Sequence, residues 1–234
     1  MYKLPAKETT HKILKDIPYV IDNWLTQEEI DFLVNMIEEN KNRDLTSLSP
    51  DSPLLQYAAV STEQQSRIFV PFIMPRFLAE KCHKIAKEFY PEPLEINHFH
   101  YIEYDPKYGQ GKYNPNLNPH FDFDNNILTI DYQLDNDIEW ELNVEGEKHL
   151  AKTNQVLVFS AINQIHWRPK RVFKEGETCK VITINMTTLD DYMFNNGVNP
   201  LDWNMYPEVR EAQLEEFNNR EDMRKFADMY EEGL

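Results

Sequence analysis

Short runs of strand-forming residues between residues 96 and 186 are the feature that most restricts the fold of this 234-residue chain. Each run is rich in β-branched and aromatic residues or alternates apolar with polar residues, and turn-forming Asn, Asp, Pro and Gly residues separate the runs. Regular spacing of this kind is typical of a β-sandwich or a β-barrel. The runs read INHFHYIEY, NILTIDYQL, IEWELNVEG, QVLVFSA and CKVITINM.

Helical patterns precede and follow these runs. Thr26 and Glu29 have the spacing of a capping box, and apolar residues recur at helical intervals after them. A second helix is expected over residues 75–90. We therefore predict one α+β domain over residues 1–234, with N-terminal helical support over about 1–95, a β-core over about 96–188 and a charged helical tail over about 189–234.

The charge balance restricts the partners of the chain. It has 24 basic and 40 acidic residues, which give a net charge of −16. Such a charge repels phosphate backbones and argues against general nucleic-acid binding. An acidic surface suits a neutral or cationic substrate, or serves only solubility. No apolar run approaches the roughly 18 residues that span a bilayer. Cys82 and Cys179 have neither metal-type nor disulfide-framework spacing, so we expect a reducing, cytoplasmic setting.

Several common catalytic motifs are missing from the sequence. It has only six glycines and contains no G-x-G-x-x-G, no phosphate-binding loop and no G-x-S-x-G turn. Nucleotide-driven chemistry and serine-hydrolase chemistry are therefore not favoured.

Two histidines and a carboxylate have the spacing of a metal site. His120 and Asp122 are two residues apart, so in an extended segment their side chains point the same way. His166 follows the strand-like run QVLVFSA. Two imidazoles and one carboxylate on one face of a metal leave coordination positions open, the arrangement of non-haem iron oxygenases. Each residue taken singly could equally be structural, and Asp124 is expected to be a turn residue rather than a ligand.

Lys180 opens the last strand-like run and shares its face with Ile182 and Ile184. A buried ammonium group is costly unless it meets an anion, and a cosubstrate that carries a carboxylate would be such an anion. Alternatively, Lys180 lies at the edge of the strand and extends its amine to water.

The region from Tyr104 to Met186 resembles the catalytic core of the iron(II)/2-oxoglutarate-dependent dioxygenases, in particular the prolyl 4-hydroxylase-like branch. The resemblance rests on Tyr104 before a loop, on His120-x-Asp122, on the strand ILTIDYQL, on QVLVFS followed by His166, and on a basic residue followed by alternating apolar residues. It implies a double-stranded β-helix, or jelly-roll, with the metal between its two sheets.

The resemblance also implies roles for individual residues. His120, Asp122 and His166 would bind iron(II), and Lys180 would pair with the distal carboxylate of 2-oxoglutarate. Tyr104 and Gln133 are further candidates for hydrogen bonds to this cosubstrate. With dioxygen as the second cosubstrate, the expected reaction is hydroxylation of a prolyl or other side chain in a peptide or protein, or of a small amino-acid-like substrate.

Some alternatives stay open on the sequence alone. The family's anchor for 2-oxoglutarate is often an arginine nearer the distal histidine. The rivals to Lys180 are Arg168, Lys170, Arg171 and Lys174. The chain could also be a non-catalytic jelly-roll binding protein, or a cupin-like metal isomerase or hydrolase that works without dioxygen.

Overall fold

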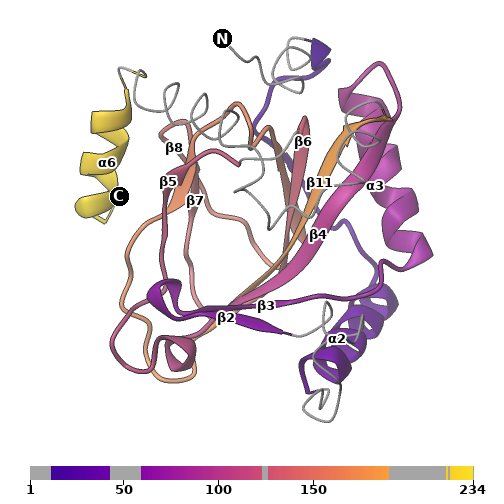
Figure 1. The fold of residues 1–234 in the computed structure, drawn as a ribbon. Coiled ribbons are helices and arrows are strands. Elements are labelled where there is room, and N and C mark those ends of the chain that lie inside the picture. Colours follow the sequence, from indigo (N-terminus) through magenta and orange to yellow (C-terminus); the bar gives the residue numbers. More distant parts are fainter. Residues whose placement is uncertain (1–11, 43–58, 123–125, 190–219, 221, 234) are drawn as a thin grey trace, which may run out of the picture.

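Two antiparallel sheets face each other in the computed structural model, which describes residues 12–42, 59–122, 126–189, 220 and 222–233 (Figure 1). The seven-stranded sheet has the order β1-β9-β6-β11-β4-β3-β2, and the four-stranded sheet the order β5-β10-β7-β8. Antiparallel sheets packed in this way, with few helices, fit a jelly-roll core. The elements are β1 (Tyr19–Ile21), α2 (Gln27–Lys41), β2 (Val60–Thr62), η3 (Glu63–Gln65), β3 (Arg67–Val70), α3 (Arg76–Phe89), β4 (Leu94–Tyr104), η4 (Pro106–Gly109), β5 (Leu117–His120), β6 (Leu128–Asn136), β7 (Leu142–Val144), β8 (Glu147–His149), β9 (Gln155–Phe159), β10 (His166–Arg168), β11 (Cys179–Thr188) and α6 (Met223–Glu231).

Strand β11 lies in the middle of the large sheet and separates two environments. Because side chains alternate along a strand, its odd-numbered residues face the small sheet and its even-numbered residues face away from it. Ile182 and Ile184 belong to the main apolar core, together with Leu33 and Leu78 of the two long helices. The more apolar face of β11 is therefore the outer one, covered by helices, and the inner face is left to more polar residues.

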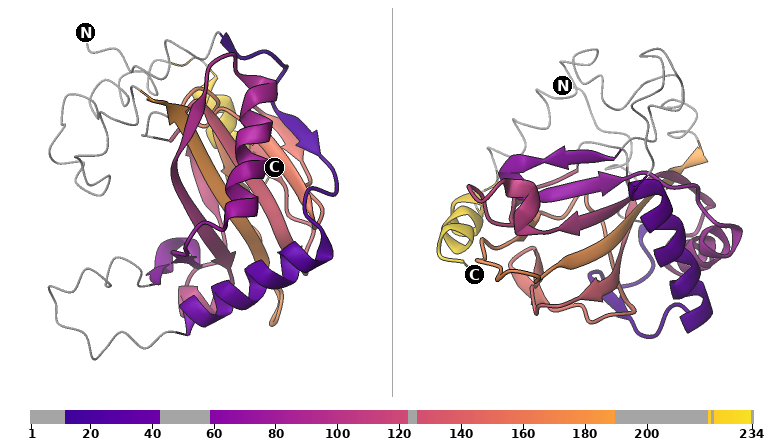
Figure 2. Two further views of the ribbon diagram at one scale, coloured as in Figure 1. Left: turned by 90° about the vertical axis from the view of Figure 1, so that its right-hand side faces the viewer. Right: turned by 90° about the horizontal axis from the view of Figure 1, so that it is seen from below.

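Helices α2 and α3 cover the outer face of the large sheet. In the left view of Figure 2, α3 runs along this sheet and α2 crosses below it. The predicted capping box forms at the start of α2: Glu29 N donates to Thr26 Oγ1 at 3.3 Å, and Thr26 N donates to Glu29 Oε2 at 2.8 Å. These bonds satisfy backbone N–H groups that have no partner within the helix.

Helix α6 packs against the outer face of the small sheet. Its Phe226 contacts Trp167 of β10, with ring centroids 5.1 Å apart, and Tyr230 Oη donates to Asn116 Oδ1 at 3.0 Å. Part of the predicted helical tail, residues 190–219, lies outside the described residues, and its helical character there stays a prediction. Within the part of the chain that the structure describes, no helix combines the length and apolarity needed to cross a membrane.

A buried carboxylate ties α2 to the large sheet. Glu103 of β4 has a side chain only 2% exposed, and it accepts bonds from Lys41 Nζ at 2.5 Å, Lys107 Nζ at 3.0 Å and Tyr101 Oη at 2.9 Å. Burial alone would raise the pKa of Glu103, but these partners outweigh it and lower the pKa to about 2. The ionised form is therefore the one that the fold stabilises.

This cluster gives a testable prediction for stability. Since the folded pKa of Glu103 lies below its ordinary value, its contribution is complete above about pH 4.5 and is lost as the pH falls toward 2. Glu103→Gln should lower the free energy of unfolding at pH 7 by about 3 kcal/mol, because Lys41 and Lys107 lose their buried anionic partner and keep only more exposed ones. Urea denaturation at pH 7 and pH 3 measures this loss, which should be smaller at pH 3.

Glu80→Gln is the matched control, since Glu80 forms a pair with Arg76 on the surface of α3. Its effect should stay within about 0.5 kcal/mol at both pH values. A loss for Glu103→Gln that is equally large at both pH values would show that charge is not the source of the stabilisation.

Candidate metal centre

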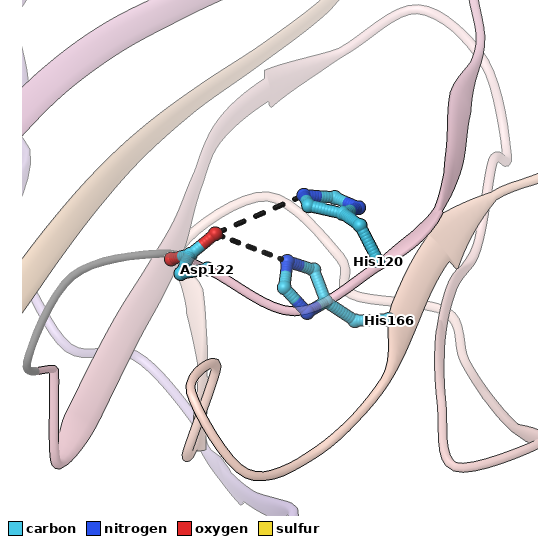
Figure 3. A group of neighbouring side chains, drawn as sticks. All are labelled: His120, Asp122 and His166. Carbon is cyan, nitrogen blue, oxygen red and sulfur yellow. Dashed lines mark ion pairs between the residues drawn. The ribbon is translucent and has the colours of Figure 1, made fainter. Parts of the chain in front are cut away.

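His120, Asp122 and His166 converge at one point between the two sheets. One ligand atom of each lies within 4.8 Å of the others. Asp122 Oδ1 is 3.7 Å from His120 Nε2 and 3.8 Å from His166 Nε2, as the dashed lines of Figure 3 show. The residues predicted to be ligands are thus brought together, and no other group of three or more possible ligands occurs in the described ranges. Asp124 lies outside those ranges.

Neighbouring strands of the small sheet position the two histidines. β5 and β10 pair antiparallel with His120 directly opposite His166, so the two rings lie side by side with centroids 4.3 Å apart. Asp122 follows the end of β5, where its backbone N–H donates to Ala161 O at 2.9 Å. A carboxylate two residues beyond His120 therefore reaches the same point as both rings.

The other ring nitrogen of each histidine is held by the backbone. His120 Nδ1 is 2.7 Å from Asn118 O, and His166 Nδ1 is 3.2 Å from Gln164 O. A carbonyl oxygen only accepts, so Nδ1 carries the hydrogen and Nε2 keeps its lone pair toward Asp122. This tautomer is the one that a metal requires at Nε2.

The charge state of the rings also fits metal binding. Burial is the main cause that lowers the pKa of His120 to about 4, with His166 adding to it, and burial likewise lowers the pKa of His166 to about 4. Both imidazoles are therefore neutral near pH 7. Two neutral nitrogen donors and one carboxylate, with one side open to a cavity, fit iron(II) of the two-histidine, one-carboxylate type.

A cavity of about 280 Å³ adjoins the three side chains. Its wall on the large sheet consists of paired rows of polar residues. One row joins His100, Thr183 and Asp131, and the next joins His98, Asn185 and Thr129. The lining of the cavity also includes Arg67, Phe69, Tyr104, Phe159 and Arg168.

Arg168 is a buried cation in the lining of this cavity. It lies on β10 two residues after His166, and it is 2% exposed. Its Nη1 donates to Trp140 O at 3.0 Å, and its Nη2 is 3.5 Å from Asp131 Oδ1. Of the cations that compete with Lys180 for the role of anchor, only Arg168 lines the cavity. Lys170 pairs with Glu231, Arg171 donates to Glu139 O, and Lys174 is exposed.

Lys180 does not line the cavity, so the structure adds no support for its expected pairing with the distal carboxylate of 2-oxoglutarate, which stays a prediction. It does share a strand face with Ile182 and Ile184, but that face is turned toward the helices. The lysine Nζ is 3.2 Å from Asp135 Oδ2 on the adjacent strand, and its side chain is 28% exposed. The alternative reading, a lysine at the edge of the sheet, describes this geometry.

Tyr104 and Gln133 have different places. Tyr104 lines the cavity, and its hydroxyl accepts a bond from Arg67 Nη1 at 3.1 Å. Gln133 is fully buried but does not line the cavity; its amide nitrogen donates to Lys180 O at 2.8 Å. The amide therefore bonds the backbone where the pairing of β6 with β11 is irregular.

Arg67, His98 and His100 line the cavity and were not among the predicted site residues. The run INHFHYIEY carries a signal that could have indicated two of them. His98, His100 and Tyr104 lie even numbers of positions apart, so they share one face of the strand. Arg67 has no comparable signal, since β3 is only four residues long.

Comparison with solved structures relates the fold to a known class. No protein-family model and no curated protein sequence matches the chain. The epimerase SnoN of nogalamycin biosynthesis, non-haem and dependent on α-ketoglutarate, matches with a TM-score of 0.56 and 9% identity over 78% of this chain and 82% of SnoN. HygX from Streptomyces hygroscopicus, solved with nickel, 2-oxoglutarate and hygromycin B, matches with a TM-score of 0.52 and 9% identity over 73% of this chain and 82% of HygX. The chain therefore shares the jelly-roll fold of SnoN and HygX, and a His-Asp-His triad lies between its sheets.

Proposed function

We propose that this protein is an iron(II)- and 2-oxoglutarate-dependent oxygenase. The observation that carries the proposal is the convergence of His120, Asp122 and His166 within 4.8 Å beside a cavity, in a fold shared with SnoN and HygX. When bound, iron(II) and 2-oxoglutarate supply dioxygen activation, coupled to the decarboxylation of 2-oxoglutarate to succinate. The protein's own residues hold the ion, orient the cosubstrate and keep water out.

Arg168 is the residue that we propose binds the distal carboxylate of 2-oxoglutarate. It lies two residues from His166 on the same side of β10, it is buried, and it lines the cavity. Its contact with Asp131, at 3.5 Å, is longer than the 2.7–2.9 Å of a charge-assisted hydrogen bond. Burial raises the pKa of Asp131, and Arg168 opposes this rise. The long contact leaves Arg168 able to pair with an incoming carboxylate, and Tyr104 also lines the cavity.

The reaction that we propose is hydroxylation of a prolyl or other side chain in a peptide or protein, or of a small amino-acid-like substrate. The prolyl 4-hydroxylase-like resemblance of residues 104–186 supports this choice. SnoN is an epimerase, so the fold also serves a reaction other than hydroxylation. We further propose a reducing, cytoplasmic setting, in keeping with the two buried free thiols of Cys82 and Cys179.

Turnover of 2-oxoglutarate tests the proposed function. The purified chain with iron(II), 2-oxoglutarate and air should form succinate and carbon dioxide, and formation should stop without iron or without dioxygen. A jelly-roll binding protein would take up 2-oxoglutarate but form no succinate in the presence of a broad peptide and amino-acid panel. A cupin-like isomerase or hydrolase would transform its substrate equally well under nitrogen, and that result would replace the proposal.

A further inference from the structure

Arg67 is a second cation in the cavity, on the wall opposite Arg168. It begins β3 in the large sheet, whereas Arg168 lies on β10 in the small sheet. Its guanidinium group stacks 4.5 Å from the centre of the Phe69 ring, and its Nη1 donates to Tyr104 Oη at 3.1 Å. These contacts hold the side chain in place without neutralising it.

The charge of Arg67 has no acidic partner among the described residues. Its contacts are with a ring and a phenol hydroxyl, and its buried Nε has no hydrogen-bond partner there. Arg168, in contrast, has Asp131 within ion-pair distance. A half-buried guanidinium without a counter-charge is costly, and an anion that enters the cavity would remove that cost.

Two histidines that line the cavity with Arg67 can add hydrogen-bond donors. His100 lines the cavity beside it, and burial, with smaller contributions from His98 and Arg67, lowers the pKa of His100 to about 4. His98 contacts Asn185 at 2.6 Å between Nε2 and Nδ2. The imidazole of His100 can donate a hydrogen bond to an anion that Arg67 attracts.

We infer that Arg67 binds an anionic group, a carboxylate or a phosphate, of the substrate. The inference rests on the proposed function, in which 2-oxoglutarate uses the metal for one end and Arg168 for its distal carboxylate. The cosubstrate then has no further anionic group for Arg67. The second cation, on the other wall of the same cavity, is left for the molecule to be oxidised.

Anion titration by calorimetry tests this inference with acetate and with inorganic phosphate. Each anion is titrated into the full chain alone and into its anaerobic complex with iron(II) and 2-oxoglutarate. The complex should bind at least one anion saturably, and Arg67→Gln should weaken this binding about ten- to a hundredfold. Arg67→Lys, which keeps a charge, should lie between them. Stronger binding of acetate indicates a carboxylate substrate, and stronger binding of phosphate a phosphorylated one.

Arg76→Gln is the matched control, because Arg76 is 92% exposed on α3 and should leave anion affinity unchanged. The inference is overturned if the loaded parent binds neither anion, or if Arg67→Gln binds them as the parent does. It is also overturned if Arg67→Gln loses 2-oxoglutarate affinity instead, since Arg67 would then serve the cosubstrate. If the parent binds no 2-oxoglutarate with iron(II), the proposed function fails, and the titration of the chain alone still decides whether Arg67 binds anions.

Discussion

Replacing His166 with alanine should reduce iron-dependent succinate formation to background while leaving the fold intact. The ring supplies one of three ligand atoms, and the cavity beside it can admit water in its place. Loss of residues that only support a ligand typically costs 10–100-fold in metal affinity or activity, so loss of the ligand itself should cost more. His120→Ala should behave alike. Iron titration, succinate assay and circular dichroism together measure the effect.

His83→Ala is the matched control, because His83 lies on α3, outside the large sheet and away from the cavity. It should retain parent turnover. Near-normal succinate formation by His166→Ala or His120→Ala would show that the triad does not hold the iron. Asp124→Asn should be much milder than Asp122→Asn, and equal damage would move the carboxylate ligand to position 124.

Replacing Arg168 with methionine should weaken 2-oxoglutarate binding by about ten- to a hundredfold, or roughly 1.5–3 kcal/mol. Methionine keeps an apolar stem in the buried space and removes the charge that we propose meets the distal carboxylate. Iron affinity measured without 2-oxoglutarate should change little, since Arg168 is not a ligand. A calorimetric titration of 2-oxoglutarate into the iron(II)-loaded variant, without air, gives the affinity.

Lys180→Met provides the control for Arg168→Met, and it separates the two candidate anchors. Lys180 pairs with Asp135 away from the cavity, so its variant should bind 2-oxoglutarate as the parent does. If Lys180→Met loses affinity while Arg168→Met keeps it, the anchor is Lys180 as the sequence suggested.

Part of the candidate metal site could be predicted from the sequence because it depends on local spacing. His120 and Asp122 share a side through the two-residue period of an extended chain, and His166 comes a few residues after a recognisable strand, β9. The capping box at Thr26 is local in the same way. The His120–Asp122 pair and the capping box each need only a few neighbouring residues, whereas His166 reaches them through the pairing of β10 with β5.

The residue proposed to bind 2-oxoglutarate could not be predicted from local spacing. Its position depends on which face of a strand points toward the cavity. Lys180 was assigned to the interior on the assumption that the more apolar face of β11 points inward. In this fold that face packs against α2 and α3, and Thr183 and Asn185 on the inner face line the cavity. Strand period fixes which residues share a face, but not what covers it.

Arg67 and the docking of α6 depend on contacts between distant parts of the chain. Arg67 enters the cavity because β3 pairs with β4, and Phe226 meets Trp167 across 59 residues of sequence, from position 167 to position 226. Pairings of this length leave no periodic signal in either segment. They follow from tertiary packing, which the composition of a short strand or helix does not encode.

The most direct test of the account is the visible spectrum of the protein with iron(II) and 2-oxoglutarate in the absence of air. Chelation of the iron by 2-oxoglutarate should give a weak charge-transfer band that saturates as 2-oxoglutarate is added to the parent. The band should be missing from His166→Ala and should need a higher concentration of 2-oxoglutarate in Arg168→Met. No band in the parent at saturating iron and 2-oxoglutarate, or a band of equal intensity in His166→Ala, would contradict the assignment of His120, Asp122 and His166 as an iron site.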